Sequence, residues 1–211
     1  MKKIGLIFDV DGTLWDARKE VADSWSEVTT SKGYKAITLD DLSKTMGLPM
    51  TSIADILFPD LKEKERYALL NECTENELVY LKKHCPKLYD QEIETLKCLK
   101  EAGFDLAILS NAQVGYIETF FDATNTSSLF IDHACWGDNQ KCKSENMLIL
   151  KERNHLDEIY YIGDTAMDEE ESAKANAKFI HASYGFGKAK HPFFVLKQFV
   201  DLLEAVKLIN R

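Results

Sequence analysis

The sequence predicts an α/β fold: a doubly wound, mostly parallel sheet with a small all-helical domain inserted after the first strand. Three observations predict it. A short apolar run begins at Ile4 and ends at Asp9, as expected for a buried strand of a parallel sheet. After Thr13 the patterns are helical for about seventy residues, which is far too long for a strand-to-helix loop. From Tyr89 onward, strand-like and helix-like segments alternate, which is typical of a doubly wound domain.

The inserted segment is expected to form a helical cap domain, residues 15–85, and residues 1–14 with 86–211 are expected to form the α/β core domain. Apolar residues recur at helical spacing within the cap. We expect its helices at residues 15–31, from 40 onward, 51–57 and 62–84, with a break at 46–49 that contains a glycine and a proline.

Along the core domain, segments with a strand-like pattern alternate with segments with a helix-like pattern. After the first strand, buried strands are expected at residues 104–109, 131–134, 159–162 and 178–181. Helices are expected at 91–100, 114–121, 145–153 and 169–175, and an amphipathic terminal helix at 194–209.

Composition narrows the function classes. With 211 residues and 45% hydrophobic composition, the chain can bury a good-sized core. Its net charge of −9 disfavours nucleic acids and anionic membranes as partners. The five cysteines form no Cys-x-x-Cys pair, and the start of the chain lacks a secretory pattern, so we expect reduced thiols and a soluble, cytoplasmic protein. Oligomeric state cannot be inferred.

The first strand ends in two carboxylates one residue apart, Asp9 and Asp11. In a strand, side chains at i and i+2 share a face, so the two charges would repel unless a cation lies between them or one keeps its proton. Ligands bind at the carboxyl ends of the strands in open α/β sheets. An ordinary Asp-Gly turn is the alternative interpretation.

Two later strands also end in polar residues. Ser110 and Asn111 follow one strand, where they could bind phosphate oxygens or simply cap a helix. Asp164 follows another, and Asp168 comes one helical turn later. Carboxylates, water and phosphate oxygens are the ligands that Mg²⁺ prefers, so the acidic residues indicate a Mg²⁺ site.

Four ordered motifs resemble those of the haloacid dehalogenase superfamily: residues 9–13, Ser110 with Asn111, Lys143, and Asp164 with Asp168. By itself Lys143 would be read as a surface charge, and only this resemblance favours it over Lys141. The helical insertion resembles the cap of the phosphoglycolate phosphatase and β-phosphoglucomutase branch. Residues 143–146 and 184–187 resemble a phosphoglycolate phosphatase-like subgroup. Lys143-Ser144 and Ala175-Asn176 stand where many relatives have Lys-Pro and Ala-Gly.

The resemblance implies a Mg²⁺-dependent phosphatase that acts on a small phosphorylated metabolite. Asp9 would be the nucleophile and Asp11 the general acid and base. The metal would be held by the Asp9 side chain, the backbone carbonyl of Asp11 and Asp164, with support from Asp168. Phosphoryl oxygens would be bound by residues that the motifs share, namely Thr13, Ser110, Asn111 and Lys143.

Two other functions remain open. A phosphomutase of the β-phosphoglucomutase type would use the same two carboxylates, and a non-catalytic module could bind phosphate or Mg²⁺ through the same cluster. The substrate is also open, because Lys44 in the cap could either meet a second anion or be a surface charge. The five histidines have no ligand-like spacing, and packing or surface roles are expected for them.

Overall fold

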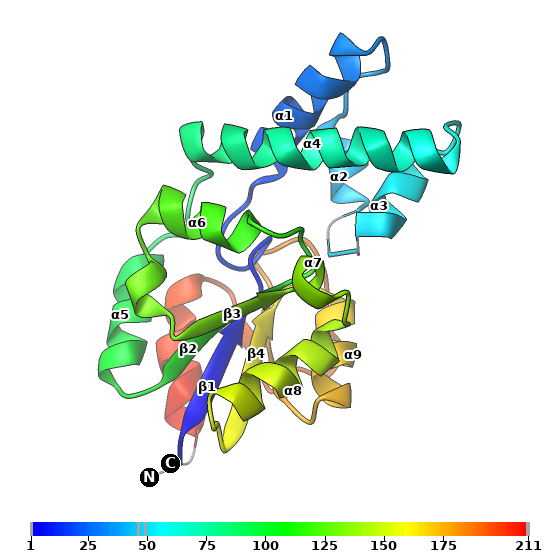
Figure 1. Cartoon of the computed structure of the whole chain (residues 1–211). Coiled ribbons are helices and arrows are strands. Elements are labelled where there is room, and N and C mark those ends of the chain that lie inside the picture. The colour runs from blue at the N-terminus through cyan, green and yellow to red at the C-terminus, as the bar shows by residue number, and fades with distance from the viewer. Residues whose placement is uncertain (1, 46, 49, 210–211) are drawn as a thin grey trace.

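The computed structural model describes residues 2–45, 47–48 and 50–209. Its centre is a parallel sheet of six strands in the order β3-β2-β1-β4-β5-β6 (Figure 1). The strands are β1 (Ile4–Phe8), β2 (Asp105–Ser110), β3 (Asp132–Cys135), β4 (Glu158–Gly163), β5 (Lys178–Ala182) and β6 (Phe194–Leu196). The doubly wound parallel sheet predicted from the sequence is confirmed.

Helices cover both faces of this sheet. They are α5 (Glu92–Glu101), α6 (Tyr116–Thr124), α7 (Trp136–Asn139), α8 (Lys143–Arg153), α9 (Ala166–Lys174) and α10 (Leu202–Ala205), with 3-10 turns at Ser127–Leu129, Phe199–Asp201 and Val206–Leu208. In Figure 1, α5 and the red C-terminal segment lie on one side of the strands, and α8 and α9 lie on the other.

The central strand β1 is buried on both faces, which explains its unbroken apolar sequence. Leu6 and Phe8 belong to the core on the α5 side, together with Leu96. Ile7 points to the opposite face, where it packs in a second core with Met147 of α8. Successive side chains of a strand alternate between faces, so one strand anchors two hydrophobic layers.

The predicted cap segment, residues 15–85, lies over the carboxyl edge of the sheet (Figure 1). Its described part contains α1 (Arg18–Ser31), α2 (Leu39–Ser43), α3 (Met50–Leu57) and α4 (Glu63–Lys83). Trp15 and Leu88 form an antiparallel bridge where the chain leaves and re-enters the core. The division into two domains at these points stays a prediction. Residues 46 and 49 of the expected break lie outside the described residues.

In the described part of the chain, no helix is both long enough and apolar enough to cross a lipid bilayer.

The prediction of one amphipathic helix over residues 194–209 is wrong. The segment begins with β6, which pairs with the open edge of β5, and continues as short helical turns. Leu196 is fully buried whereas Val195 is 45% exposed, an alternation of strand type that three residues are too short to reveal in a sequence. Asp201 then accepts the backbone N–H groups of Lys197 and Gln198 and starts the helical part.

The strand character of β6 can be tested with two alanine variants. Leu196→Ala should lower the free energy of unfolding by about 2–5 kcal/mol, because it leaves a cavity in the core. Val195→Ala should change it by about 0.5 kcal/mol or less, because that side chain faces solvent. Urea unfolding of the two variants measures the difference. Equal losses would contradict the strand.

Candidate active site

Three carboxylates meet at the carboxyl ends of β1 and β4. The Asp9 N–H donates to the carbonyl of Ile162 at 2.8 Å, which extends the pairing of the two strands by one residue. Asp164 follows β4 directly, and Asp168 lies in the first turn of α9. One carboxylate oxygen from each of Asp9, Asp164 and Asp168 lies within 4.8 Å of the others, and all three residues are buried.

Lys143 supplies the positive charge for this cluster. It is the first residue of α8 and is only 2% exposed. Its Nζ lies 3.0 Å from Oδ2 of Asp9 and 2.7 Å from Oδ1 of Asp168. Burial opposes the charge, but attraction by Asp168 and Asp9 outweighs it and holds the pKa of the ammonium group well above its usual value. Lys141, the other candidate, is exposed.

Asp164 has the geometry expected of a metal ligand. Its Oδ2 accepts the Phe186 N–H at 2.6 Å, whereas its Oδ1 is buried without a hydrogen-bond partner among the described residues. Burial, together with the negative charge of Asp168, raises the pKa of Asp164 to about 7. A divalent cation would satisfy the open oxygen and offset the repulsion, so this donor set fits Mg²⁺.

Both carboxylate oxygens of Asp168 already accept hydrogen bonds from other residues of the protein. Its Oδ1 accepts from Lys143, and its Oδ2 accepts the N–H of Thr165 at 3.0 Å and the hydroxyl of the same residue at 2.7 Å. These bonds close a capping box at the start of α9. Asp168 is therefore placed to orient Lys143 and the helix start, in line with its predicted supporting role.

Two glycines let the backbone approach Asp164. Gly12 has φ +78°, and a Cβ added there would lie 2.5 Å from Oδ2 of Asp164. A Cβ on Gly185 would lie 2.3 Å from the Gly12 carbonyl oxygen. Only glycine fits at either position. The segment 184–187, noted in the sequence for its resemblance alone, thus holds Asp164 through the Phe186 N–H.

Asp11 does not belong to the cluster of three carboxylates and has hydrogen-bond partners of its own. Its Oδ1 accepts the Tyr116 hydroxyl at 2.6 Å and the Trp15 indole N–H at 3.2 Å. Burial raises the pKa of Asp11 to about 7, although the bond from Tyr116 opposes the rise. Sequence reasoning missed the role of Trp15 and also that of Tyr116. In sequence it is one more aromatic residue of an apolar helix face.

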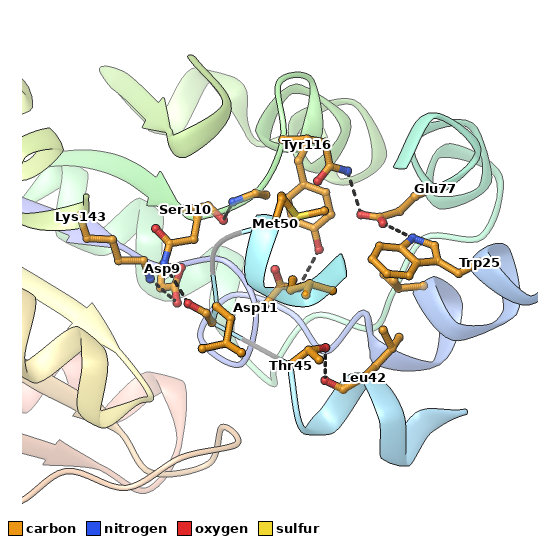
Figure 2. Close-up of a pocket in the computed structure, with 17 residues that line it drawn as sticks. Asp9, Asp11, Trp25, Leu42, Thr45, Met50, Glu77, Ser110, Tyr116 and Lys143 are labelled. Atoms are coloured by element: carbon orange, nitrogen blue, oxygen red, sulfur yellow. Dashed lines mark hydrogen bonds and ion pairs between the residues drawn. The ribbon is translucent and has the colours of Figure 1, made fainter. Parts of the chain in front are cut away.

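A cavity of about 70 Å³ lies between the cap segment and the core (Figure 2). Asp9 and Asp11 line it together with Ser110, Asn111 and Lys143, so the structure brings most of the predicted catalytic and phosphate-binding residues to one space. The Ser110 Oγ accepts the N–H of Ala112 at 3.2 Å, which leaves its own O–H group to donate.

Two residues that the resemblance assigns to phosphate binding, Thr13 and Asn111, have side chains that either lie outside the cavity or already bond to the cap. Thr13 is fully buried, does not line the cavity, and its Oγ1 has no hydrogen-bond partner among the described residues. The side-chain amide of Asn111 lines the cavity but donates to the Gly47 carbonyl of the cap at 2.8 Å. Asn111 thereby joins the core to the cap.

Glu77 of α4 lines the cavity at the end far from Lys143, beside Trp25 (Figure 2). One carboxylate oxygen accepts the Trp25 indole N–H, and the other accepts the Gln113 amide at 3.1 Å. Burial raises the pKa of Glu77 to about 8, against the effect of these two bonds. The sequence offers no signal for this residue, because it lies in a helix rich in charges and its burial depends on tertiary packing.

Comparisons with known proteins agree with this geometry. A family model described as haloacid dehalogenase-like hydrolase matches residues 6–182. The phosphoglycolate phosphatase of Aquifex aeolicus is 29% identical over 208 residues, which cover 94% of each chain. A crystal structure of a predicted phosphoglycolate phosphatase from Haemophilus somnus superposes with a TM-score of 0.83 at 20% identity, covering 97% of both chains. That of CbbY from Rhodobacter sphaeroides, in complex with phosphate, has a TM-score of 0.81 at 16% identity, covering 99% of this chain and 100% of that one.

Magnesium binding can be tested through stability. At a Mg²⁺ concentration of about 100 times Kd, the free energy of unfolding should rise by about 2.7 kcal/mol. Asp164→Asn should lose this gain, because the amide removes one anionic ligand while its oxygen can still accept the Phe186 N–H. Thermal unfolding with Mg²⁺ and with EDTA measures both.

Asp90→Asn is the matched control, because Asp90 is exposed and distant from the cluster. It should retain the full Mg²⁺ response. A response of Asp164→Asn as large as that of the unmodified protein would mean that Asp164 does not hold the cation.

Proposed function

Because the chain belongs to the haloacid dehalogenase-like hydrolase family, we propose that it is a Mg²⁺-dependent phosphatase that hydrolyses a small phosphate monoester through an aspartyl phosphate on Asp9. The superfamily membership predicted from the sequence is confirmed by that match. The observation that carries the proposal is the placement of Asp9 beside the buried Lys143 ammonium group and the open oxygen of Asp164, at one end of the cavity.

In the first step, a carboxylate oxygen of Asp9 attacks phosphorus, and the bond from phosphorus to the substrate alcohol breaks. Asp11 donates its proton to the leaving oxygen. A pKa of about 7 suits this task, since an efficient general acid titrates near the working pH. Tyr116 and Trp15 hold the Asp11 carboxyl group in place through their two hydrogen bonds.

In the second step, Asp11 accepts a proton from water, and the water oxygen attacks phosphorus. The bond between Asp9 and phosphorus breaks, which releases inorganic phosphate and restores the carboxylate. Lys143 and the Ser110 hydroxyl are placed to bind phosphoryl oxygens in both steps.

Electrostatic stabilisation is the larger part of this catalysis. General acid catalysis contributes about 10²–10⁴ in rate, or roughly 3–5 kcal/mol. Hydrolysis of a phosphate monoester requires the barrier to fall by more than about 20 kcal/mol. A Mg²⁺ ion held by Asp9, the Asp11 carbonyl and Asp164 would neutralise charge on the phosphoryl group. Lys143, whose Nζ lies 3.0 Å from Oδ2 of Asp9, contributes to the same effect.

The substrate is proposed to be a small metabolite. The cavity that would take the alcohol is small, about 70 Å³. The separate roles open to Asp9 and Asp11 favour an enzyme over a binding module, whereas a phosphomutase would use the same two carboxylates. Relatives named phosphoglycolate phosphatase make phosphoglycolate the first ester to assay. A cytoplasmic location belongs to the same proposal.

The function can be tested by phosphate release from a panel of small esters with Mg²⁺. We expect sustained turnover that EDTA abolishes and that Asp9→Asn abolishes, because an amide is a poor nucleophile and Asp168, the other carboxylate beside Lys143, is already held by Thr165. Release of stoichiometric phosphate without turnover, or activity retained in Asp9→Asn, would contradict the proposal. Return of the phosphoryl group to a sugar phosphate would instead indicate a mutase.

The role of Asp11 can be tested with leaving groups of different basicity. In Asp11→Asn, kcat/KM for an alkyl phosphate should fall by about 10²–10⁴, because its alkoxide requires protonation. The value for acetyl phosphate should fall much less, since acetate leaves without a proton. Steady-state kinetics on both esters measures the losses. Equal losses would count against Asp11 as the acid.

A further inference from the structure

We propose that this enzyme is specific for phosphate esters of small alcohols whose far end carries a hydrogen-bond donor and no anion, with Glu77 as the specificity-determining residue. The proposal rests on the phosphatase function above and names its substrate class. It also predicts that a carboxylate-bearing ester such as phosphoglycolate is a poor substrate.

The cavity has two chemically different ends (Figure 2). Asp9, Ser110 and Lys143 lie together at one end, and Glu77 lies with Trp25 at the other. When the phosphoryl group is next to Asp9, the alcohol must extend past Asp11 toward Glu77. The far end therefore contacts the leaving group.

Most of the cavity wall that the cap segment contributes is apolar. Six apolar side chains from the cap segment line the cavity: Val21, Trp25, Leu42, Leu48, Met50 and Ile53. Such a wall favours a short aliphatic chain and gives an ionised group little compensation for the water that it loses.

Glu77 is arranged to accept hydrogen bonds. An N–H group reaches each of its oxygens, from Trp25 on one and from Gln113 on the other. Each carboxylate oxygen has a second lone pair, so a hydroxyl or ammonium group of the ligand can donate to it. Such a donor would favour the charged form of Glu77. A ligand carboxylate would instead place a third acidic group in the space that already holds Asp11 and Glu77.

The cavity offers no cation to a second anion. Among the described lining residues, Lys143 is the only lysine or arginine, and it is held by Asp9 and Asp168 at the phosphate end. Lys44, the cap lysine that could have met a second anion, lies outside the cavity, is exposed, and pairs with Asp40. The sequence left both roles of Lys44 open, and its placement favours the surface charge.

The experiment compares esters that share a two-carbon frame and differ at the far end: 2-hydroxyethyl phosphate, phosphoethanolamine and 2-phosphoglycolate. At a pH above 8, where Glu77 with its raised pKa of about 8 is ionised, we expect kcat/KM for the hydroxyl and ammonium esters to exceed that for phosphoglycolate by at least about tenfold, because like charges in a partly desolvated cavity repel strongly. Acetyl phosphate serves as the general test of phosphatase activity.

Glu77→Gln, assayed at the same pH, is the informative variant, because it removes the charge that Glu77 carries above pH 8 and can keep the bond from Trp25. Its preference for 2-hydroxyethyl phosphate over phosphoglycolate should fall by at least about tenfold. Glu75→Gln is the matched control on the same helix, since Glu75 is exposed and does not line the cavity, and its preference should not change. Thermal unfolding checks that both variants are folded.

The possible results test three separate claims: the substrate class, the role of Glu77 and the phosphatase function. Phosphoglycolate hydrolysed as well as or better than the other two esters would overturn the substrate class, even if Glu77→Gln fails to fold. An unchanged preference in folded Glu77→Gln would overturn the role of Glu77. No phosphate release from any ester, acetyl phosphate included, would overturn the phosphatase function itself.

Discussion

The buried ammonium group of Lys143 is the interaction on which the rest of the site depends. It lies within 3.0 Å of both Asp9 and Asp168, in a place where three carboxylates are gathered out of solvent. Without it, the like charges would repel, and each carboxylate would lose its hydration uncompensated. Lys143 balances part of this charge. The negative charge that remains unbalanced lies mainly on Asp164, whose buried Oδ1 has no partner among the described residues.

The positions of these groups follow from the parallel sheet. β1 and β4 are neighbours, so Asp9 and Asp164 emerge side by side. α8 and α9 pack on the same face of the sheet, which delivers Lys143 and Asp168 to that point from two different segments. The glycines at 12 and 185 then permit backbone and carboxylate to approach within distances that any side chain would prevent. The strands and helices thus hold together carboxylates that would otherwise repel one another.

The cap segment completes the site in a different manner. Two hydrogen bonds join it to the loop after β2, from Asn111 to Gly47 and from Gln113 to Glu77. They start from Asn111 and Gln113, one and three residues after the motif serine, Ser110. In the proposed mechanism, the same loop would bind the phosphoryl group and contact the wall around the alcohol. The core would then supply the chemistry on phosphorus, and the apolar cap wall with Glu77 would select the alcohol.

The sequence by itself determined the sheet, the edge where the polar residues gather and the motif residues other than Lys143, which only the family resemblance distinguished from Lys141. These are local signals, because an apolar run followed by Asp9 and Asp11, or by Asp164, can be recognised without knowing what lies beside it. Most of the strands and the helices that face them could be predicted for the same reason. The terminal segment could not, since three residues of β6 are assigned only by the open edge of β5 that they pair with.

Only the tertiary structure decided the surroundings of those motifs. Tyr116 is 105 residues from Asp11, and Glu77 receives its bonds from Trp25 and Gln113, which are 52 and 36 residues away. No spacing in the chain encodes such contacts, because they arise where segments far apart in sequence pack together: within the core for Tyr116, within the cap segment for Trp25, and between the two for Gln113. For the same reason Asn111 donates to the cap and Lys44 lies outside the cavity. Local patterns thus specify the reacting groups, whereas long-range packing sets their pKa values and the space left for the substrate.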